Sequence, residues 1–246
     1  MTNRMNCFLF LYLLFYSCQH PPADTLDLPV TPDPPIPSFT ENVDILALGD
    51  SYTKGESVAW AQNFPHQLAD SLRSDGRKVA DPRVIAQTGW RTDQLQAAIQ
   101  SSSNQDLRDS VFSLVTLCIG VNNQYQGANF DTYKTQFEDL LQTAIQRAGN
   151  RKNRVCVLSI PDWAFTPYGQ NFSSDPGLIS QQLDEYNAVI RAFAEQYGVH
   201  YVYVTDISRK ALAQPDLVAK DGLHPSAKQY TAWMKLLLPL ARKALK

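Results

Sequence analysis

Five short apolar runs, separated by longer amphipathic stretches, are the feature that most constrains the fold of this chain. The runs cover residues 43–48, 84–86, 111–119, 154–160 and 199–204. Each has the length and composition of a buried strand. The stretches between them repeat apolar residues at helical spacing, most clearly over 130–145 and 179–197. This alternation predicts an α/β fold with a five-stranded parallel sheet and helices on both faces.

Glycine and proline suggest where some of these helices begin and end. Pro65 suits the first turn of a helix that continues through Leu72. Gly198 follows the stripe at 179–197 in the position of a C-cap. Pro239 lies within the last apolar stripe, and we expect it to kink or end that helix.

Composition excludes several classes of protein. The 22 Lys and Arg residues nearly balance 24 Asp and Glu, which argues against a nucleic-acid binder with a broad basic surface. The hydrophobic content of 44% is that of a chain that buries a core. The four cysteines are too few and too scattered for a disulfide framework, and no zinc-ligand spacing occurs.

The amino terminus has the pattern of an export signal. Arg4 precedes an apolar run from Phe8 to Tyr16, which is too short to span a bilayer. The run ends at Ser17 and Cys18, and it resembles a bacterial lipoprotein signal that is cleaved before a lipid-bearing cysteine. We therefore expect a signal peptide over 1–17 with Cys18 as the lipid site. Simple secretion and an uncleaved anchor are the alternatives.

A proline-rich segment follows the signal. Residues 19–38 contain seven prolines and show no helical or strand period, which is typical of an extended, semi-rigid spacer. The sequence thus predicts a tether over 18–39 and a folded domain over 40–246. The expected location is the periplasm or cell envelope, with membrane contact only through the lipid on Cys18. We expect a monomer that binds no nucleic acid.

Polar residues follow the predicted strands in four separate segments, at 49–53, 87–91, 120–123 and 221–225. Right-handed crossovers bring the carboxyl ends of parallel strands to one edge of the sheet, where ligands bind. The four segments supply a hydroxyl, an imidazole, a carboxylate and an amide, which together suffice for acyl transfer.

The residue types predict a role for each side chain. Ser51 is the candidate nucleophile, and His224 is the base that accepts its proton. Asp221 lies three residues before His224 and can orient the ring. The backbone N–H groups of Ser51 and Gly89 and the amide of Asn122 are candidate oxyanion donors. This chemistry requires no metal and no organic cofactor.

These segments resemble the blocks of the SGNH (GDSL-type) hydrolase superfamily. The matching blocks are GDSYT at 49–53, the glycine at 89, GVNN at 120–123 and DGLH at 221–224, and the resemblance spans about 43–240. It implies a flavodoxin-like three-layer α/β/α sandwich, with the family roles on Ser51, Gly89, Asn122, Asp221 and His224. Tyr52 stands where the family often has Leu, and Asn123 where Asp is frequent, which bears on substrate shape.

Other residues compete for some of these roles. His20, His66 and His200 have no acid close before them and are expected to be structural or solvated. Asp206 also follows the fifth predicted strand and is the rival of Asp221, whereas Asp50 is expected to structure its loop.

Aromatic residues recur on the predicted strand-end loops. Candidate substrate-binding residues are Tyr52, Trp90, Tyr125 and Trp163, the last within an aromatic-rich loop over 161–172. These rings could stack on a sugar, line an acyl pocket, or only pack the loops onto the domain. Cys118 and Cys156, on neighbouring predicted strands, could form a disulfide or remain buried thiols.

The sequence therefore predicts an exported serine esterase that works through an acyl-enzyme intermediate. Its substrate would be a small-molecule, glycan or lipid ester. The alternatives are an acyltransferase, a lysophospholipase, and a catalytically silent glycan-binding lipoprotein.

Overall fold

The computed structural model describes residues 42–108 and 110–246. Its five strands are all parallel and stand in the order β2-β1-β3-β4-β5. Their bounds are β1 Ile45–Gly49, β2 Arg83–Ala86, β3 Leu114–Cys118, β4 Val155–Leu158 and β5 His200–Val202. This is the strand order of the flavodoxin-like sandwich, so the predicted sheet is confirmed.

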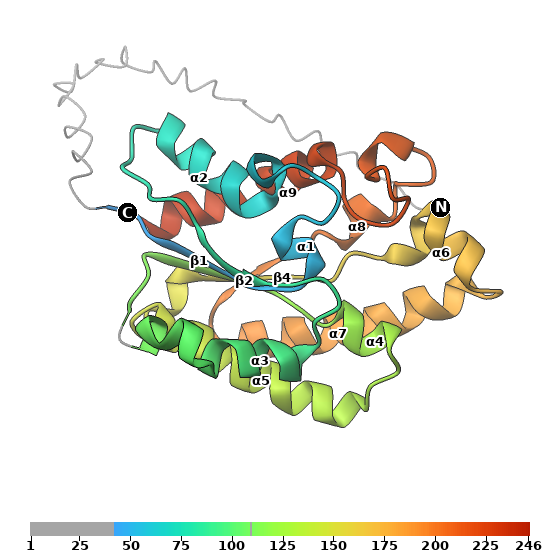
Figure 1. Ribbon diagram of the computed structural model, residues 1–246, viewed down its shortest axis with the longest axis horizontal. Coiled ribbons are helices and arrows are strands. Elements are labelled where there is room, and N and C mark those ends of the chain that lie inside the picture. Colours follow the sequence, from blue (N-terminus) through green and yellow to red (C-terminus); the bar gives the residue numbers. More distant parts are fainter. Residues whose placement is uncertain (1–41, 109) are drawn as a thin grey trace, which may run out of the picture. The chain divides into compact units, whose positions relative to one another are not determined.

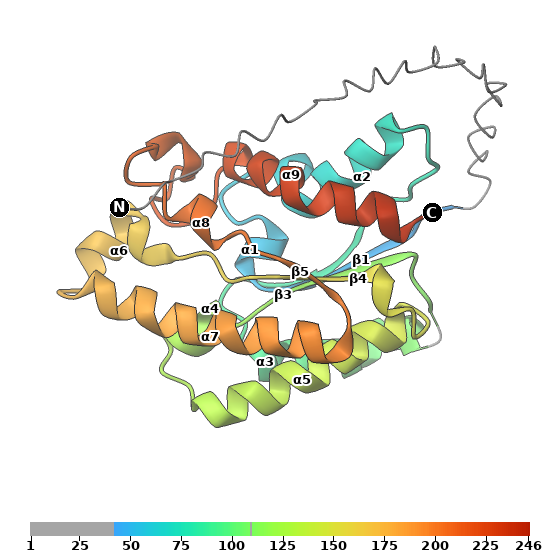
Figure 2. The ribbon, with the colours of Figure 1, turned by 180° about the vertical axis from the view of Figure 1, so that it is seen from behind.

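Helices cover both faces of the sheet (Figure 1). The α-helices are α1 Ser51–Lys54, α2 Phe64–Ser74, α3 Thr92–Gln100, α4 Val121–Tyr125, α5 Phe130–Arg147, α6 Pro167–Phe172, α7 Pro176–Tyr197, α8 Thr205–Ser208 and α9 Ala227–Ala244. Single turns of 3₁₀ helix are η1 Trp60–Gln62, η3 Lys152–Arg154, η4 Trp163–Phe165 and η5 Pro215–Leu217, and the longer 3₁₀ segment η2 Ser102–Arg108 is interrupted at Asn104. Helices α2 and α9 lie on one face, and α3, α5 and α7 on the other, as the reverse view also shows (Figure 2).

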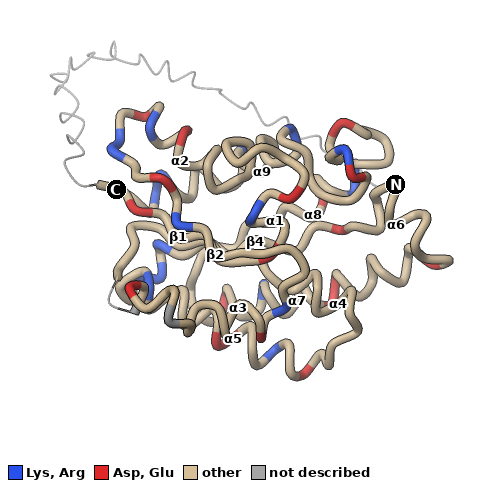
Figure 3. Tube along the Cα trace, in the orientation of Figure 1, with Lys and Arg blue, Asp and Glu red and all other residues tan. Residues whose placement is uncertain are grey.

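The sheet forms the centre of the hydrophobic core. Every residue of β1, β3 and β4 is buried, and none of these strands carries a charge. This is expected for strands that are covered on both faces. In Figure 3 the charged residues lie mainly on the helices and connecting segments. Polar side chains near the site therefore come from the strand-end loops.

The strands are shorter than their apolar runs. The third run extends from 111, but β3 begins at Leu114 and the side chain of Val111 is 55% exposed. Val43 forms only an isolated bridge to Val79 ahead of β1. Apolar composition marks a buried segment, but a strand also requires a hydrogen-bonded neighbour along its whole length.

Two expectations about the helix ends are tested directly. Gly198 has a φ of +71° and caps α7, as its position in the sequence predicts. Pro239 was expected to kink or end the last helix, and it does not end it, because α9 continues to Ala244. Pro239 is exposed, so its ring takes no space in the core, while the apolar face of α9 packs beneath it at Leu237 and Ala241.

The two domain cysteines are free thiols. Cys156 stands opposite Thr116, so Cys118 lies two positions further along β3. Both side chains are buried, and burial raises the pKa of Cys156 to about 12.

The predicted signal at 1–17, the lipid site at Cys18 and the tether at 18–39 lie outside the described residues. Among the residues that are described, no helix combines the length and apolar character needed to cross a membrane.

Candidate active site

One pocket at the carboxyl edge of the sheet brings together residues from all four predicted segments. Its volume is about 250 Å³. The lining consists of Ser51, Tyr52, Thr88, Gly89, Val121, Asn122, Tyr125, Gln126, Trp163, Tyr168, Leu223 and His224. Ser51 follows β1, Gly89 follows β2, and Asn122 follows β3, as the parallel sheet requires.

A tight turn after β1 holds Ser51 at the first position of α1. The carboxylate of Asp50 caps this helix by accepting the N–H of Tyr52 at 3.0 Å. A Cβ on Gly49 would lie 2.1 Å from Thr53 Oγ1 and 2.3 Å from the carbonyl oxygen of Cys118. Only glycine therefore fits at this close approach of the turn to β3. The Ser51 side chain is buried at the base of the pocket.

Asp221 and His224 form a hydrogen-bonded pair beside Ser51. The distance from His224 Nδ1 to Asp221 Oδ2 is 2.5 Å. Asp221 Oδ1 accepts the backbone N–H groups of Leu223 and His224, each at 3.0 Å. The described residues form no hydrogen bond from Ser51 Oγ to the His224 ring, so their shared pocket is what relates the two side chains.

The ionised form of the Asp221 carboxyl group is strongly favoured. Partial burial alone would raise its pKa, but hydrogen bonds from Ser57, His224 and two backbone N–H groups outweigh burial and lower the pKa to about 2. Asp221 is therefore ionised at neutral pH. A carboxylate in this position holds the Nδ1–H tautomer of His224, which leaves Nε2 free to accept a proton.

Two of the candidate oxyanion donors, Gly89 and Asn122, stand on the neighbouring segments after β2 and β3. Asn122 Nδ2 donates to the carbonyl oxygen of Trp90 at 2.9 Å, which uses one of its two hydrogens. Gln126 Nε2 donates to the carbonyl oxygen of Gly89 at 3.0 Å and ties the same two loops together. Asn123 faces away from the pocket and accepts the N–H of Thr92 at 3.1 Å, which anchors α4 to α3.

An aromatic wall closes the far side of the pocket. Trp163 contacts Tyr125 and Phe172 edge-to-face, with ring centroids 5.4 and 5.5 Å apart. The hydroxyls of Tyr125 and Tyr168 lie 2.9 Å apart and join the loops after β3 and β4. Trp163 Nε1 donates to Gln124 Oε1 at 2.9 Å, so its indole is held in one orientation.

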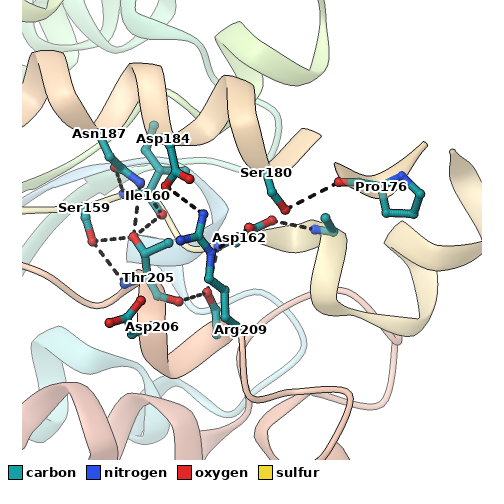
Figure 4. A network of polar contacts seen from close by, with 12 residues as sticks. Ser159, Ile160, Asp162, Pro176, Ser180, Asp184, Asn187, Thr205, Asp206 and Arg209 are labelled. Carbon is teal, nitrogen blue, oxygen red and sulfur yellow. Dashed lines mark hydrogen bonds and ion pairs between the residues drawn. The ribbon is translucent and has the colours of Figure 1, made fainter. Parts of the chain in front are cut away.

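A buried polar network holds the loop that carries Trp163 (Figure 4). Asp162 is fully buried, caps the η4 turn through the N–H of Ala164, and accepts Arg209 Nε at 3.0 Å. Asn187 Oδ1 accepts the N–H of Ile160 at 2.7 Å from the side of α7. This network fixes the path of the chain between β4 and the aromatic wall.

The pocket is almost free of charge. His224 is the only titratable side chain of its lining other than tyrosine. No cluster of three or more potential metal ligands occurs among the residues that the structure describes. The lining is therefore suited to a neutral ligand.

The matching family model is described as the GDSL-like lipase/acylhydrolase family and covers residues 47–232. The chain belongs to this family. This GDSL-like hydrolase is thus a serine hydrolase of the SGNH type that acts on ester bonds. No curated protein matches its sequence.

Solved structures share the fold of this GDSL-like hydrolase at low sequence identity. A lipase from a goat rumen metagenome is 15% identical with a TM-score of 0.64, covering 80% of this chain and 97% of its own. The acetylxylan esterase Axe2 from Geobacillus stearothermophilus is 16% identical with a TM-score of 0.60, covering 83% and 96%. A GDSL-like lipase from Bacteroides thetaiotaomicron is 21% identical with a TM-score of 0.56, covering 82% and 89%.

Of the competing residues, His20 lies outside the described part of the chain, and the other three lie away from the pocket lining of this GDSL-like hydrolase. His66 is buried, and its Nδ1 lies 2.7 Å from Asn63 Oδ1. His200 begins β5. Asp206 accepts the hydroxyl of Tyr203 at 3.2 Å and is not part of the pocket lining. His224 is therefore the only histidine in the pocket, and Asp221 is the carboxylate that contacts it.

The aromatic candidates divide into two groups. Tyr52, Tyr125 and Trp163 line the pocket. Tyr52 also contacts the His224 ring edge-on, with the two ring centroids 5.9 Å apart. Trp90 is absent from the lining and packs partly buried against the core. It follows the same strand as Gly89, but its side chain serves packing and its carbonyl positions Asn122.

One contact in the site was not predicted from the sequence. Ser57 Oγ donates to Asp221 Oδ2 at 2.6 Å. The two residues are 164 positions apart, and Ser57 lies outside every matching block, so no spacing signal could have identified it. Nearby, Glu56 accepts hydrogen bonds from Thr88 and Lys54, which lower the pKa of its carboxyl group.

Proposed function

We propose that this hydrolase is a serine esterase in which Ser51, His224 and Asp221 form a catalytic triad. The observation that carries the proposal is the single pocket lined by Ser51 and His224, with Asp221 held 2.5 Å from the His224 ring. A nucleophile, a base and an orienting acid are the groups that acyl transfer by serine requires.

The reaction proceeds in two steps. His224 Nε2 accepts the proton of Ser51 Oγ as this oxygen attacks the ester carbonyl and a tetrahedral intermediate forms. His224 then returns the proton to the departing alcohol, which leaves an acyl group on Ser51. Water attacks this acyl-enzyme while giving up a proton to His224. His224 then returns that proton to Ser51 Oγ as the bond to the acyl group breaks and the carboxylic acid is released.

Three donors stabilise the negative oxygen of each intermediate. They are the backbone N–H groups of Ser51 and Gly89 and the Asn122 amide hydrogen that Trp90 does not use. Supporting this, Ser51, Gly89 and Asn122 all line the pocket. Asn122 is also held in place by its bond to the Trp90 carbonyl.

The substrate is a neutral ester with a short acyl chain. The pocket volume of about 250 Å³ falls just below the range of roughly 300–1,000 Å³ typical of small-molecule sites. Its walls are aromatic and aliphatic, and it offers no Lys or Arg to a phosphate or carboxylate. Both features favour a short-acyl ester of a small molecule or glycan over a lysophospholipid.

We also propose that the protein is exported and held at the cell envelope by lipid on Cys18. The apolar run from Phe8 to Tyr16 and the cysteine that follows it support this location. Mass spectrometry of the membrane fraction should find an amino-terminal peptide that begins at a lipidated Cys18. A retained signal with an unmodified cysteine would contradict the proposal.

The esterase proposal is tested with p-nitrophenyl esters of increasing chain length, using the wild type and Ser51→Ala. We expect turnover that is lost in Ser51→Ala and that is faster on the acetate and butyrate than on the octanoate and palmitate. Equal turnover by both proteins would exclude Ser51 as the nucleophile. Ser51-dependent acyl transfer to an added alcohol in preference to water would indicate the acyltransferase instead.

A further inference from the structure

A four-residue loop after α1 links the segment that carries Ser51 to Asp221. This loop, residues 55–58, follows α1 in the chain and reaches Asp221 through the side chain of Ser57. Ser51 and Asp221 lie near opposite ends of the folded domain in the sequence, and the contact of Tyr52 with the His224 ring is a second link between their segments. Ser57 is therefore a direct link between the segment of the nucleophile and the segment of the base.

The loop is attached firmly to the turn that carries Ser51. The backbone N–H groups of Gly55 and Glu56 both donate to the carbonyl oxygen of Ser51, at 2.9 and 3.0 Å. Asn63 Nδ2 donates to the carbonyl oxygen of Lys54 at 3.0 Å. The position of Ser57 is thus set relative to Ser51 by a short series of hydrogen bonds.

The backbone of Ser57 is in an unfavourable conformation. Its φ is +65°, and Asn150 is the only other non-glycine residue with positive φ in the described part of the chain. A left-handed conformation is uncommon for serine, and unlike Asn it gains little from local hydrogen bonding there. Strain of this kind persists where the surrounding structure holds it, and it often marks a functional position.

The hydroxyl of Ser57 completes the coordination of the Asp221 carboxylate. Oδ1 accepts two backbone N–H groups, and Oδ2 accepts His224 Nδ1 and Ser57 Oγ. The O–H···O distance of 2.6 Å is typical of a hydrogen bond to an ionised acceptor. The terminal torsion of an aspartate is otherwise broad, so a donor on each side of Oδ2 limits its movement relative to the His224 ring.

We propose that Ser57 is a positioning residue that acts through Asp221, holding Oδ2 against His224 so that Nε2 faces Ser51. The proposal rests on the catalytic triad proposed above. It adds a fourth side chain that touches no substrate and lies outside the pocket lining. Because Ser57 is exposed, water competes for its hydroxyl, and its contribution to the rate is modest.

The left-handed backbone of Ser57 allows stability and activity to be separated. Ser57→Gly removes the hydroxyl while relieving the conformational strain, since glycine adopts positive φ at no steric cost. Ser57→Asn also tolerates this conformation and offers an amide that can donate to Asp221. Asn150→Gly relieves the same kind of strain in the turn after α5, far along the chain from the site, and serves as the matched control.

The measurements are kcat and KM on p-nitrophenyl acetate and the thermal midpoint Tm. For Ser57→Gly we expect kcat to fall about three- to tenfold, the size of effect of one exposed hydrogen bond, with KM within about twofold of the wild type. We expect its Tm to be equal to or above that of the wild type. Ser57→Asn should recover most of kcat, and Asn150→Gly should keep the wild-type kcat.

Two outcomes would overturn the proposal. The first is a Ser57→Gly enzyme with wild-type kcat; if Ser51→Ala is inactive in the same assay, the triad still stands and only the role of Ser57 is lost. The second is a Ser57→Gly enzyme in which kcat and Tm fall together and Ser57→Asn restores only Tm, which would assign the hydroxyl to folding. An active Ser51→Ala would instead reject the proposed function itself.

Discussion

Among the residues proposed outside the triad, Asn122 is expected to have the largest effect on turnover. We expect Asn122→Ala to lower kcat by on the order of 10²–10³, because one donor to the oxyanion is lost. The same change removes the hydrogen bond to the Trp90 carbonyl, so Tm must be measured alongside kcat. A variant that keeps its Tm and its full kcat would remove Asn122 from the oxyanion site.

Asp221 and Asp206 are a matched pair of acids for testing the orienting role. Asp221→Asn should reduce kcat severely, by up to about 10⁴-fold, because an amide cannot hold the His224 tautomer that leaves Nε2 unprotonated. Asp206→Asn should be mild, since Asp206 contacts Tyr203 outside the pocket. The two variants are compared by steady-state kinetics on one ester, and a reversed order of effects would reassign the acid.

The capping residue of α1 makes stability depend on pH. Asp50 is fully buried, and desolvation raises its pKa to about 7, against hydrogen bonds that lower it. Between about pH 4 and pH 7 the folded state therefore binds a proton that the unfolded chain has released, so stability falls as pH rises through this window. The loss reaches on the order of a few kcal/mol above pH 7.

We expect Asp50→Asn to flatten this dependence. Asparagine keeps the capping acceptor but cannot ionise. Thermal unfolding of both proteins from pH 4 to pH 8 tests the expectation, and the slope of Tm against pH is the quantity compared, because any constant packing cost of the amide leaves the slope unchanged. Equal slopes would show that Asp50 does not titrate in this range. Asp221, whose pKa is lowered to about 2, contributes stability that is lost only as pH falls below about 4.

Sequence periodicity predicted well the helices whose own apolar stripe marks the face that is buried. The stripe at 130–145 is α5, and the stripe at 179–197 lies within α7, which begins three residues earlier at Pro176. The third apolar run was longer than its strand, because pairing with β1 begins only at Leu114. Pro239 failed as a terminator because tertiary packing of α9 outweighs one missing backbone hydrogen bond.

The residues of the candidate site likewise divide into those that the sequence predicted and those that it did not. Ser51 and Asn122 follow β1 and β3, and His224 lies in the segment before α9. All three sit in short motifs, so the expected topology predicted that they meet at one edge of the sheet. Ser57 could not be found, because its bond to Asp221 depends on the left-handed turn of a loop that carries no motif. Trp90 follows a strand as predicted, but it packs partly buried against the core and is absent from the pocket lining, so its contact with substrate stays a prediction.

At the scale of the whole molecule, the described lining of the pocket lies within the folded domain. It extends from Ser51 to His224. Removal of residues 1–37 should therefore leave Tm unchanged and kcat/KM on a soluble ester within about twofold of that of the full chain, because every residue of the described lining is retained.

The same deletion tests the proposed anchor. If Cys18 carries lipid, the full chain should sediment with membranes and the shortened chain should stay in the supernatant. The substitution Cys18→Ala separates the anchor from the tether, because it removes the lipid site but retains the proline-rich segment. A lipid on Cys18 adds hydrophobic burial in the membrane without touching the pocket, so all three proteins should hydrolyse a soluble ester equally. A full chain that remains in the supernatant would reject the anchor, and a shortened chain with impaired hydrolysis would show that the amino-terminal segment contributes to the site.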